Sequence, residues 1–157
     1  MASGFFSLEA GGSQTIKRLL DVSIAVKDLD AAVQRYSAVL GLEPRLLPPE
    51  HYAYPGLKGA RFYLGSVAIS LVASEEPSTP IAKFLETRGE GLNHISVEVT
   101  DLEQDMRHLA DKGVTFITDG PLAFPEGRVV FAHPRSLHGV QIAFVEMTPG
   151  VDSRAAS

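Results

Sequence analysis

The sequence predicts an α+β fold in which two tandem βαβββ modules form one cupped, mixed β-sheet. The first observation is an internal repeat: a shift of 73 residues superimposes residues 28–30 on residues 101–103, and both segments read acidic-leucine-acidic. The same shift superimposes Val67 on Val140 near the other end of each copy. The second observation is that each copy begins with an alternating segment and continues with a segment of helical period. Such a repeat indicates two copies of one supersecondary unit.

The repeat sets the organisation that we expect for the chain. A single domain covers residues 18–146, made of module one at 18–73, a linker helix at 78–90 and module two at 91–146. The Gly- and Ser-rich residues 1–17 and the aperiodic residues 147–157 are expected to be flexible tails, because nothing in them predicts a regular element.

Each module is expected to open with a strand, at residues 20–27 and 92–100. In the first segment, Val22 and Ile24 alternate with Asp21 and Ser23. In the second segment, apolar residues alternate in the same way with His94, Ser96 and Glu98. A period of two over this length predicts a strand with one apolar face and one polar face.

A helix is expected after each of these strands. Asp28 and Asp101 suit the N-cap position, because an aspartate side chain accepts hydrogen bonds from the free N–H groups of the first turn. Apolar residues at helical spacing follow both caps, and each set forms one stripe. Gly41 and Gly113 are expected to end the two helices in the left-handed conformation.

Three shorter strands are expected to complete each module. They fall at residues 43–47, 59–65 and 66–73 in module one and at 114–118, 127–132 and 139–146 in module two. Between the modules, Pro80 suits the first turn of the linker helix, with Ser78 or Thr79 as its cap. Two such sheets related by a pseudo-twofold axis can curl around one cavity.

Composition excludes several functional classes. The chain has 157 residues, and 14 Lys and Arg against 19 Asp and Glu give a net charge of −5. Because the basic residues are scattered, we expect no nucleic-acid and no membrane partner. The absence of cysteine excludes disulfides, cysteine zinc sites and thiol nucleophiles. No apolar run has the length of a membrane span and the first residues do not resemble a secretory signal, so we expect a cytoplasmic protein.

Several short segments carry a family resemblance, and they are residues 24–30, 80–85 with 88–91, 93–95, and 133–136 with 139–140. They are similar to the vicinal oxygen chelate superfamily, which includes glyoxalase I, bleomycin-resistance proteins and extradiol dioxygenases. The branch that they resemble most is the methylmalonyl-CoA epimerases. The resemblance covers about residues 19–146 and implies the paired βαβββ fold and a small-molecule enzyme.

The resemblance also implies a metal site, from which this chain departs. Those epimerases hold a divalent metal with four residues, usually His, Gln or Glu, His and Glu. The corresponding positions here are Asp21, Ser70, His94 and Ala143, and the repeat shift relates them in the same two pairs. Serine is a weak ligand and alanine is none, so we expect no tightly bound metal and no other cofactor; a divalent metal is the alternative. The partner base of the epimerases would lie near Gly59 and is missing.

His94 is the candidate for proton transfer, because imidazole is the side chain best matched to acid–base catalysis near neutral pH. A core histidine that hydrogen-bonds a neighbour is the alternative. Asp21, at the equivalent position of module one, is expected to raise the pKa of His94 and to orient its ring. A strand-edge charge facing water is the alternative for Asp21.

Five further residues have the strand parity of cavity-lining residues and are predicted to bind substrate: Arg61, Tyr63, Ser70, Glu98 and Gln141. Arg61 suits a carboxylate or an enolate oxygen, with a salt bridge to Glu98 as its alternative. Solvent exposure at the cavity mouth is the alternative for the last three. The proline-flanked residues 51–54 predict an aromatic loop over the opening, and His108 is expected to be structural.

These expectations favour a small-molecule enzyme that abstracts a proton next to a carbonyl, as an epimerase, isomerase or lyase, without a tightly bound metal. The resemblance implies an acyl-CoA thioester as the substrate class. Two alternatives stay open: a metal-dependent methylmalonyl-CoA epimerase, and a non-catalytic protein that binds or sequesters a small molecule. We expect a homodimer, the commonest soluble oligomer.

Overall fold

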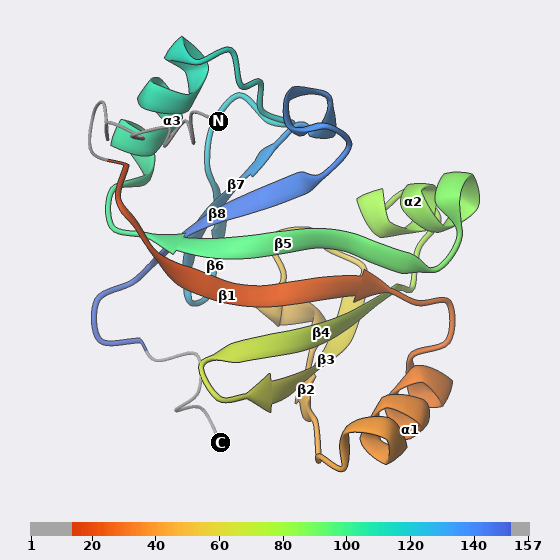
Figure 1. Ribbon diagram of the computed structural model, residues 1–157. Coiled ribbons are helices and arrows are strands. Elements are labelled where there is room, and N and C mark those ends of the chain that lie inside the picture. The colour runs from red at the N-terminus through yellow and green to blue at the C-terminus, as the bar shows by residue number, and fades with distance from the viewer. Residues whose placement is uncertain (1–13, 152–157) are drawn as a thin grey trace, which may run out of the picture.

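The computed structural model describes residues 14–151, and its elements follow one another in two similar sets (Figure 1). The strands are β1 (Ile16–Ala25), β2 (Arg45–Leu47), β3 (Leu57–Leu64), β4 (Val67–Ser74), β5 (Gly91–Val99), β6 (Leu122–Phe124), β7 (Gly127–Ala132) and β8 (Gln141–Met147). The helices are α1 (Leu29–Leu40), α2 (Pro80–Arg88), α3 (Leu102–Asp111) and two short 3₁₀ turns, η1 (Pro49–His51) and η2 (Pro134–Leu137).

The strands form one mixed eight-stranded sheet with the order β2-β3-β4-β1-β5-β8-β7-β6. β1 and β5 lie antiparallel at its centre, and each pairs in parallel with the last strand of its own module. Across the centre, Asp21 lies opposite Ser96 and Ser23 lies opposite His94. The shift of 73 residues relates Asp21 to His94 and Ser23 to Ser96, so a twofold axis between β1 and β5 exchanges these two pairs. The register therefore agrees with the repeat found in the sequence.

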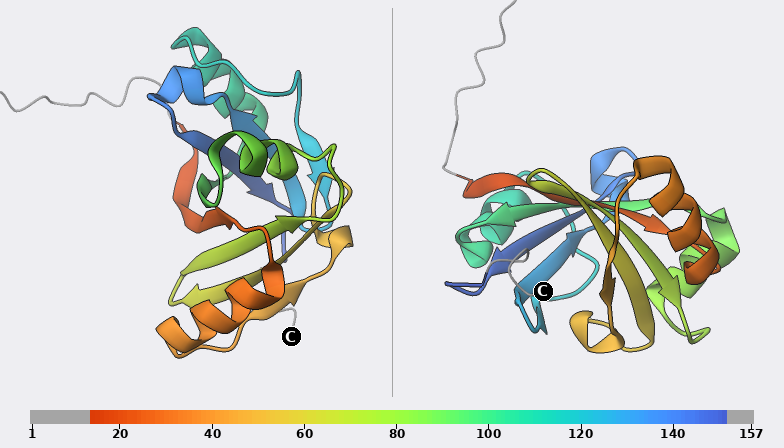
Figure 2. Two further views of the ribbon diagram at one scale, coloured as in Figure 1. Left: turned by 90° about the vertical axis from the view of Figure 1, so that its right-hand side faces the viewer. Right: turned by 90° about the horizontal axis from the view of Figure 1, so that it is seen from below.

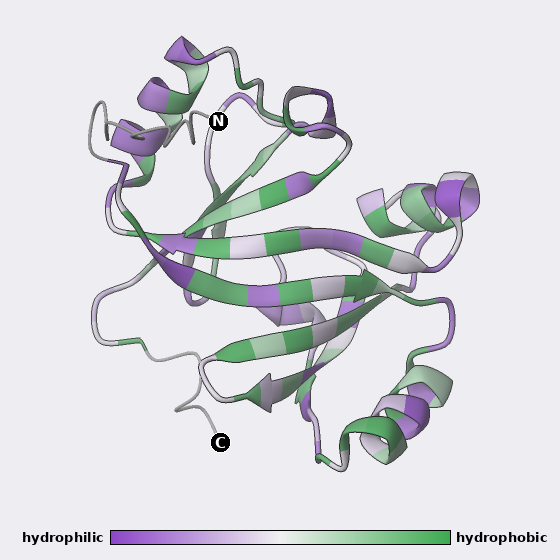
Figure 3. Ribbon diagram, in the orientation of Figure 1, coloured by the Kyte–Doolittle hydropathy of each residue, from purple (hydrophilic) through white to green (hydrophobic). Residues whose placement is uncertain are grey.

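The helices divide the sheet into an outer and an inner face. α1 packs on the outer face of module one, where Phe62 and Leu71 are fully buried, and α3 packs on the outer face of module two, where its Leu102 clusters with Val130 of β7. The inner faces of the two halves lie opposite one another like the sides of a cup (Figure 2). Polar and apolar residues alternate along β1 and β5 (Figure 3), which lets each strand serve both faces.

The predicted helix caps are confirmed. Asp28 accepts a hydrogen bond from the Ala31 N–H at 3.1 Å, and Asp101 accepts one from the Gln104 N–H at 3.0 Å. Gly41 ends α1 in the left-handed conformation with φ +66°. α3 ends at Asp111 with Lys112 as its C-cap, and Gly113, the next residue, has the expected positive φ of +86°. Within the described residues, none of the helices has the length and hydropathy needed to cross a membrane.

One expected strand is wrong. Residues 114–118 contribute only an isolated bridge between Phe116 and Ala132, and the edge strand of module two is β6, at Leu122–Phe124. The Thr115 N–H donates to the Ser136 hydroxyl rather than to a neighbouring strand, so the ladder does not extend. The backbone of residues 114–118 therefore bonds in part to a side chain, and it does not form a regular strand.

The expected N-terminal tail is also too long. β1 begins at Ile16, and the backbone N–H and the hydroxyl of Thr15 both donate to the Asp105 carboxylate at 2.9 Å. These bonds tie Thr15 to α3. At the other end, Met147 still belongs to β8. The remainder of the two expected tails, residues 1–13 and 152–157, lies outside the described residues.

Candidate active site

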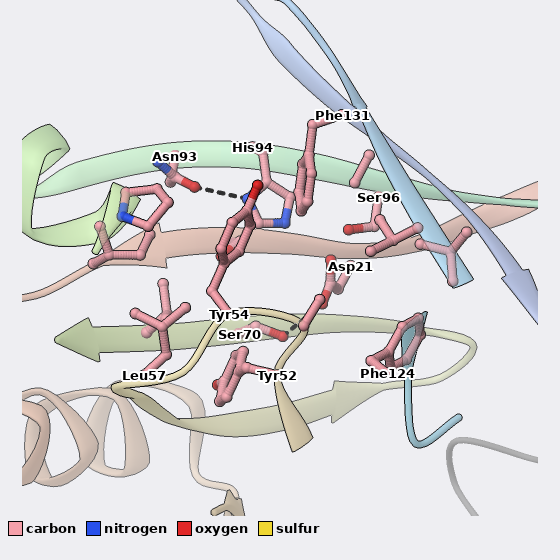
Figure 4. Close-up of a pocket in the computed structure, with 18 of the residues that line it drawn as sticks. Asp21, Tyr52, Tyr54, Leu57, Ser70, Asn93, His94, Ser96, Phe124 and Phe131 are labelled. Carbon is pink, nitrogen blue, oxygen red and sulfur yellow. Dashed lines mark hydrogen bonds between the residues drawn. The ribbon is translucent and has the colours of Figure 1, made fainter. Parts of the chain in front are cut away.

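A cavity of about 180 Å³ lies on the inner face of the sheet, between the two modules (Figure 4). Its polar wall comes from the centre of the sheet, where β1, β4 and β5 present Asp21, Ser23, Ser70, His94 and Ser96. Its apolar wall combines aliphatic and aromatic side chains, among them Leu57, Val72, Ile81, Phe124 and Phe131. Such a cavity suits a mostly apolar ligand with one polar end.

The four positions that the family resemblance singled out, and that the repeat shift relates in pairs, all line this cavity. In the two parallel ladders, Ser23 lies opposite Ser70 in module one, and Ser96 lies opposite Ala143 in module two. Asp21 and His94 occupy the preceding inward positions of β1 and β5. The register argument made from sequence therefore places these side chains on the correct face.

Asp21, Ser70 and Arg61 form a hydrogen-bonded group on the floor of the cavity. The Ser70 hydroxyl donates to Asp21 Oδ2 at 2.8 Å (Figure 4), and Arg61 Nε donates to Ser70 Oγ at 3.2 Å. Arg61 Nη2 lies 3.5 Å from Asp21 Oδ2. The salt bridge of Arg61 is thus with Asp21, and not with Glu98 as the alternative had it. The nearby Asp21 charge helps to raise the pKa of Arg61 against the lowering effect of burial, so the guanidinium stays charged.

His94 projects from β5 into the cavity opposite this group. Its Nδ1–H donates to Asn93 Oδ1 at 2.7 Å, and its ring meets Phe131 edge to face with centroids 5.5 Å apart. Burial lowers the pKa of His94, and the Asp21 charge acts in the opposite direction but does not outweigh it. The net shift is therefore opposite to the one expected, because the enclosed site penalises the imidazolium more than one carboxylate stabilises it.

A β-bulge explains why Asn93 and His94 lie together. The register between β1 and β5 moves from Ser23–His94 to Ile24–Leu92, so Asn93 is an extra residue in its strand. A bulge interrupts the alternation of side chains and re-aims one of them. Both residues line the cavity as a result. Asn93 was missed from the sequence because strict alternation points it to the outer face.

The segment from His51 to Tyr54 covers the cavity and contacts both modules. Tyr52 and Tyr54 pack against the cluster of module one and α2, whereas Ala53 packs against the inner cluster of module two. His51 Nδ1 lies 3.5 Å from a carboxylate oxygen of Glu126, in the turn between β6 and β7. This segment therefore lines the cavity and bridges the two modules, at the place where the sequence predicted an aromatic loop.

Tyr52 also explains the missing partner base. A side chain at position 59 would project into space that the Tyr52 hydroxyl and the Leu71 carbonyl oxygen occupy. Burial raises the pKa of Tyr52 well above its usual value, so the phenol stays protonated. Packing therefore excludes a carboxylate at position 59.

Two expected lining residues lie elsewhere. Glu98 has the expected parity, but its carboxylate accepts from Arg18 Nε at 2.7 Å and from Lys17 Nζ at 3.4 Å, and it lines neither this cavity nor a smaller one beside it. The reason is that β5 runs past the cavity to where Arg18 stands opposite Glu98. Tyr63 lines the smaller cavity, which shares Asp21 and Arg61 with the main one.

Gln141 lies where the sequence placed it, opposite His94 in the ladder and against the main cavity. His108 lies on α3, away from the cavity. Further lining residues were not among the predicted site residues, although residues 51–54 were expected over the opening: Ser23, His51, Tyr52, Tyr54, Asn93, Ser96, Phe124 and Phe131. Strand parity is the signal for Ser23 and Ser96, whereas the loop residues carried only the proline-flanked aromatic pattern.

The residues at the four family positions do not fit a divalent metal. Ala143 has no ligand atom, and the Ser70 hydroxyl is a neutral group that already donates to Asp21. The Arg61 guanidinium, 3.5 Å from the Asp21 carboxylate, supplies positive charge at the place where a metal would supply it. Among the described residues, one acidic cluster has metal-like spacing, Asp101, Glu103 and Glu146, but Arg128 binds two of its members and it lies outside the cavity.

Comparisons with known proteins agree on one family. The sequence profile of the Glyoxalase/Bleomycin resistance protein/Dioxygenase superfamily matches residues 21–131. The chain is 33% identical over 127 residues to an ethylmalonyl-CoA/methylmalonyl-CoA epimerase of Cereibacter sphaeroides, covering 79% of this chain and 93% of that protein.

Solved structures give the same result. The methylmalonyl-CoA epimerase of Mycobacterium tuberculosis superimposes with a TM-score of 0.76 at 32% identity, covering 88% of this chain and 93% of that one. A Streptomyces coelicolor methylmalonyl-CoA epimerase variant, in complex with 2-nitronate-propionyl-CoA, superimposes with a TM-score of 0.74 at 29% identity, covering 87% and 99%.

Proposed function

The chain belongs to the glyoxalase/bleomycin resistance protein/dioxygenase superfamily, and on that premise we propose that it is an acyl-CoA epimerase-type enzyme that works without a tightly bound metal. It abstracts a proton next to a thioester carbonyl. The substrate class is supported by relatives that are named for CoA thioesters or were solved with one.

The observation that carries this proposal is the state of His94. Because Asn93 Oδ1 is an acceptor only, the hydrogen bond fixes the proton of the neutral imidazole on Nδ1 and leaves the lone pair on Nε2. Burial favours this neutral form. A neutral imidazole held in one orientation inside a cavity is suited to act as a general base.

The polar groups on the cavity wall opposite His94 define the rest of the reaction. The C–H bond next to the carbonyl breaks, its proton goes to His94 Nε2, and its electron pair moves onto the carbonyl oxygen as an enolate. The Ser70 proton is committed to Asp21, so Arg61 is the charged donor for that oxygen. Because position 59 carries no second base, a water molecule supplies the proton to the other face, which inverts the carbon centre. His94 gives up its own proton to solvent, so solvent hydrogen enters the inverted product.

Incorporation of solvent deuterium tests the proposal. We expect at least one acyl-CoA thioester to exchange its α-proton in D₂O by NMR in the presence of the protein and a chelator. His94→Ala should slow this exchange by about two to four orders of magnitude, the usual contribution of one general base. His108→Ala, a histidine outside the cavity, is the matched control and should keep full activity.

The same experiment separates the alternatives. If a chelator abolishes the exchange, the alternative of a metal-dependent epimerase is correct. Tight binding without exchange of any thioester would favour a binding or sequestering protein, for which the largely apolar cavity would suffice. Near-normal exchange by His94→Ala would make His94 a structural histidine and refute the mechanism.

The proposal includes a homodimer in the cytoplasm. Support for self-association comes from large apolar side chains on the surface: Val39 is 68% exposed, and Leu46, on the edge strand β2, is 66% exposed. Light scattering during size-exclusion chromatography tests the dimer, and a mass equal to one chain would refute it. Cell fractionation tests the location.

A further inference from the structure

One oxygen of the Asp21 carboxylate is buried without a partner. The residue is 7% exposed, and its Oδ2 faces the Ser70 hydroxyl and Arg61. Its Oδ1 has no hydrogen-bond partner among the described residues. Leaving a buried acceptor unsatisfied is costly, more so when it carries charge, and such groups are normally satisfied by water or a ligand. Because Asp21 lines the cavity, a ligand can supply that donor.

The charges around the cavity indicate what kind of donor fits. Asp21 and Arg61 carry opposite charges and lie together, so their charges offset one another. Burial holds the pKa of both lining histidines, His51 and His94, below the usual value, which leaves them neutral near pH 7. A ligand carboxylate would meet Asp21 with no unpaired cation to receive it, and an ammonium group would meet Arg61. A neutral group that donates a hydrogen bond avoids both costs.

We propose that the acyl group of the substrate carries a hydroxyl close to the thioester carbonyl, and that this hydroxyl donates to Asp21 Oδ1 while the carbonyl oxygen accepts from Arg61. This proposal rests on the proposed function for the thioester and its carbonyl. The substrate class is then a hydroxyacyl thioester with a short alkyl group against the apolar wall of Leu57, Val72 and Ile81, rather than a 2-carboxyacyl thioester.

Four thioesters with the same carbon chain test the proposal by calorimetry in the presence of EDTA: butyryl-CoA, 2-hydroxybutyryl-CoA, 3-hydroxybutyryl-CoA and ethylmalonyl-CoA. We expect one of the hydroxybutyryl thioesters to bind about ten-fold or more tightly than butyryl-CoA, the value of one hydrogen bond to a charged group. Ethylmalonyl-CoA should bind most weakly, because its carboxylate faces Asp21.

Variants test whether the Asp21 carboxylate causes the preference for a hydroxyl group. Asp21→Asn should reduce the advantage of the hydroxyl group by about ten-fold and relieve the exclusion of ethylmalonyl-CoA, because the charge is lost while the shape is kept. Asp111→Asn, which makes the same change at the exposed end of α3 outside the cavity, should leave both ratios unchanged. Circular dichroism confirms that each variant is folded.

The outcomes distinguish this inference from the function on which it rests. If the hydroxybutyryl thioesters bind best but none exchanges its α-proton, the hydroxyl subsite stands and the enzyme function fails. If ethylmalonyl-CoA binds best or exchanges fastest, the function stands and the inference is overturned. The inference is also overturned if wild type and Asp21→Asn bind the hydroxybutyryl thioesters and ethylmalonyl-CoA with the same affinities relative to butyryl-CoA. A protein that binds none of the four thioesters overturns both the inference and the proposed function.

Discussion

The Tyr52 hydroxyl occupies the space into which a side chain at position 59 would project, so Tyr52 and Gly59 fit together on the inner face of β3. Tyr52 comes from the segment that covers the cavity, and Gly59 comes from the strand beneath it. The glycine is required here by a close approach and not by its backbone conformation. Tyr52 can therefore keep its place over the cavity only if position 59 of β3 carries no side chain.

We predict that Gly59→Ala destabilises the protein by about 1–3 kcal/mol, the usual cost of overpacking a core. The new methyl group meets the Leu71 carbonyl oxygen as well as the Tyr52 hydroxyl, and backbone cannot easily move aside. Urea unfolding measures the change. The control is Gly120→Ala, where a β-carbon would have nothing within 4 Å and which should be close to neutral. Equal stability of the two variants would contradict the described packing.

Asp21→Asn is predicted to shift the acidic limb of the pH–rate profile to lower pH. Burial lowers the pKa of His94 and the Asp21 charge raises it, so removing that charge lowers the pKa further. His94 acts as a base in its neutral form, which then persists at lower pH. Rates of deuterium exchange between pH 4 and 8 measure the limb. A limb that stays in place or moves to higher pH would show that the two groups do not interact.

His51 is predicted to make stability depend on pH. Its pKa is lowered from 6.5 to about 4, first by burial and then by the Arg61 and Arg45 charges, with Asp21 acting in the opposite direction. Between these two values the unfolded chain binds more protons at this site than the folded one, so stability decreases as the pH falls from 6.5 to 4.

His51→Gln should remove this contribution, which is on the order of 3 kcal/mol for a shift of this size. Urea unfolding at pH 7 and pH 4.5 measures the difference between the two proteins. His94 and the carboxylates titrate in both, so the comparison isolates His51. Parallel pH dependences would mean that His51 is not enclosed as described.

Purified protein is predicted to carry far less than one equivalent of manganese, cobalt, zinc, nickel or iron. The reason is the donor set, in which Ala143 cannot ligate and the Ser70 hydroxyl already donates to Asp21. Inductively coupled plasma mass spectrometry after dialysis measures the content. One equivalent that survives dialysis, with exchange abolished by a chelator, would contradict the proposal.

Much of the fold and part of the site could be predicted from sequence. Alternation in β1 and β5 placed Asp21 and His94 on the inner face, and the family resemblance, with which the repeat shift agrees, placed Ser70 and Ala143 beside them. Glu98 shows the limit of this reasoning, because parity gives the face of a strand and not how far the cavity extends along it.

By itself, the sequence determined the two modules, the Asp28 and Asp101 caps and the polar groups that face inward, because periodicity and capping are local properties of the chain. Only the tertiary structure decided how those groups act. The bulge that turns Asn93 toward His94, and the contact of Glu126 with His51, join segments that are distant in sequence. The pKa of His94 was decided in the same way, since desolvation by burial outweighs the charge of the Asp21 carboxylate.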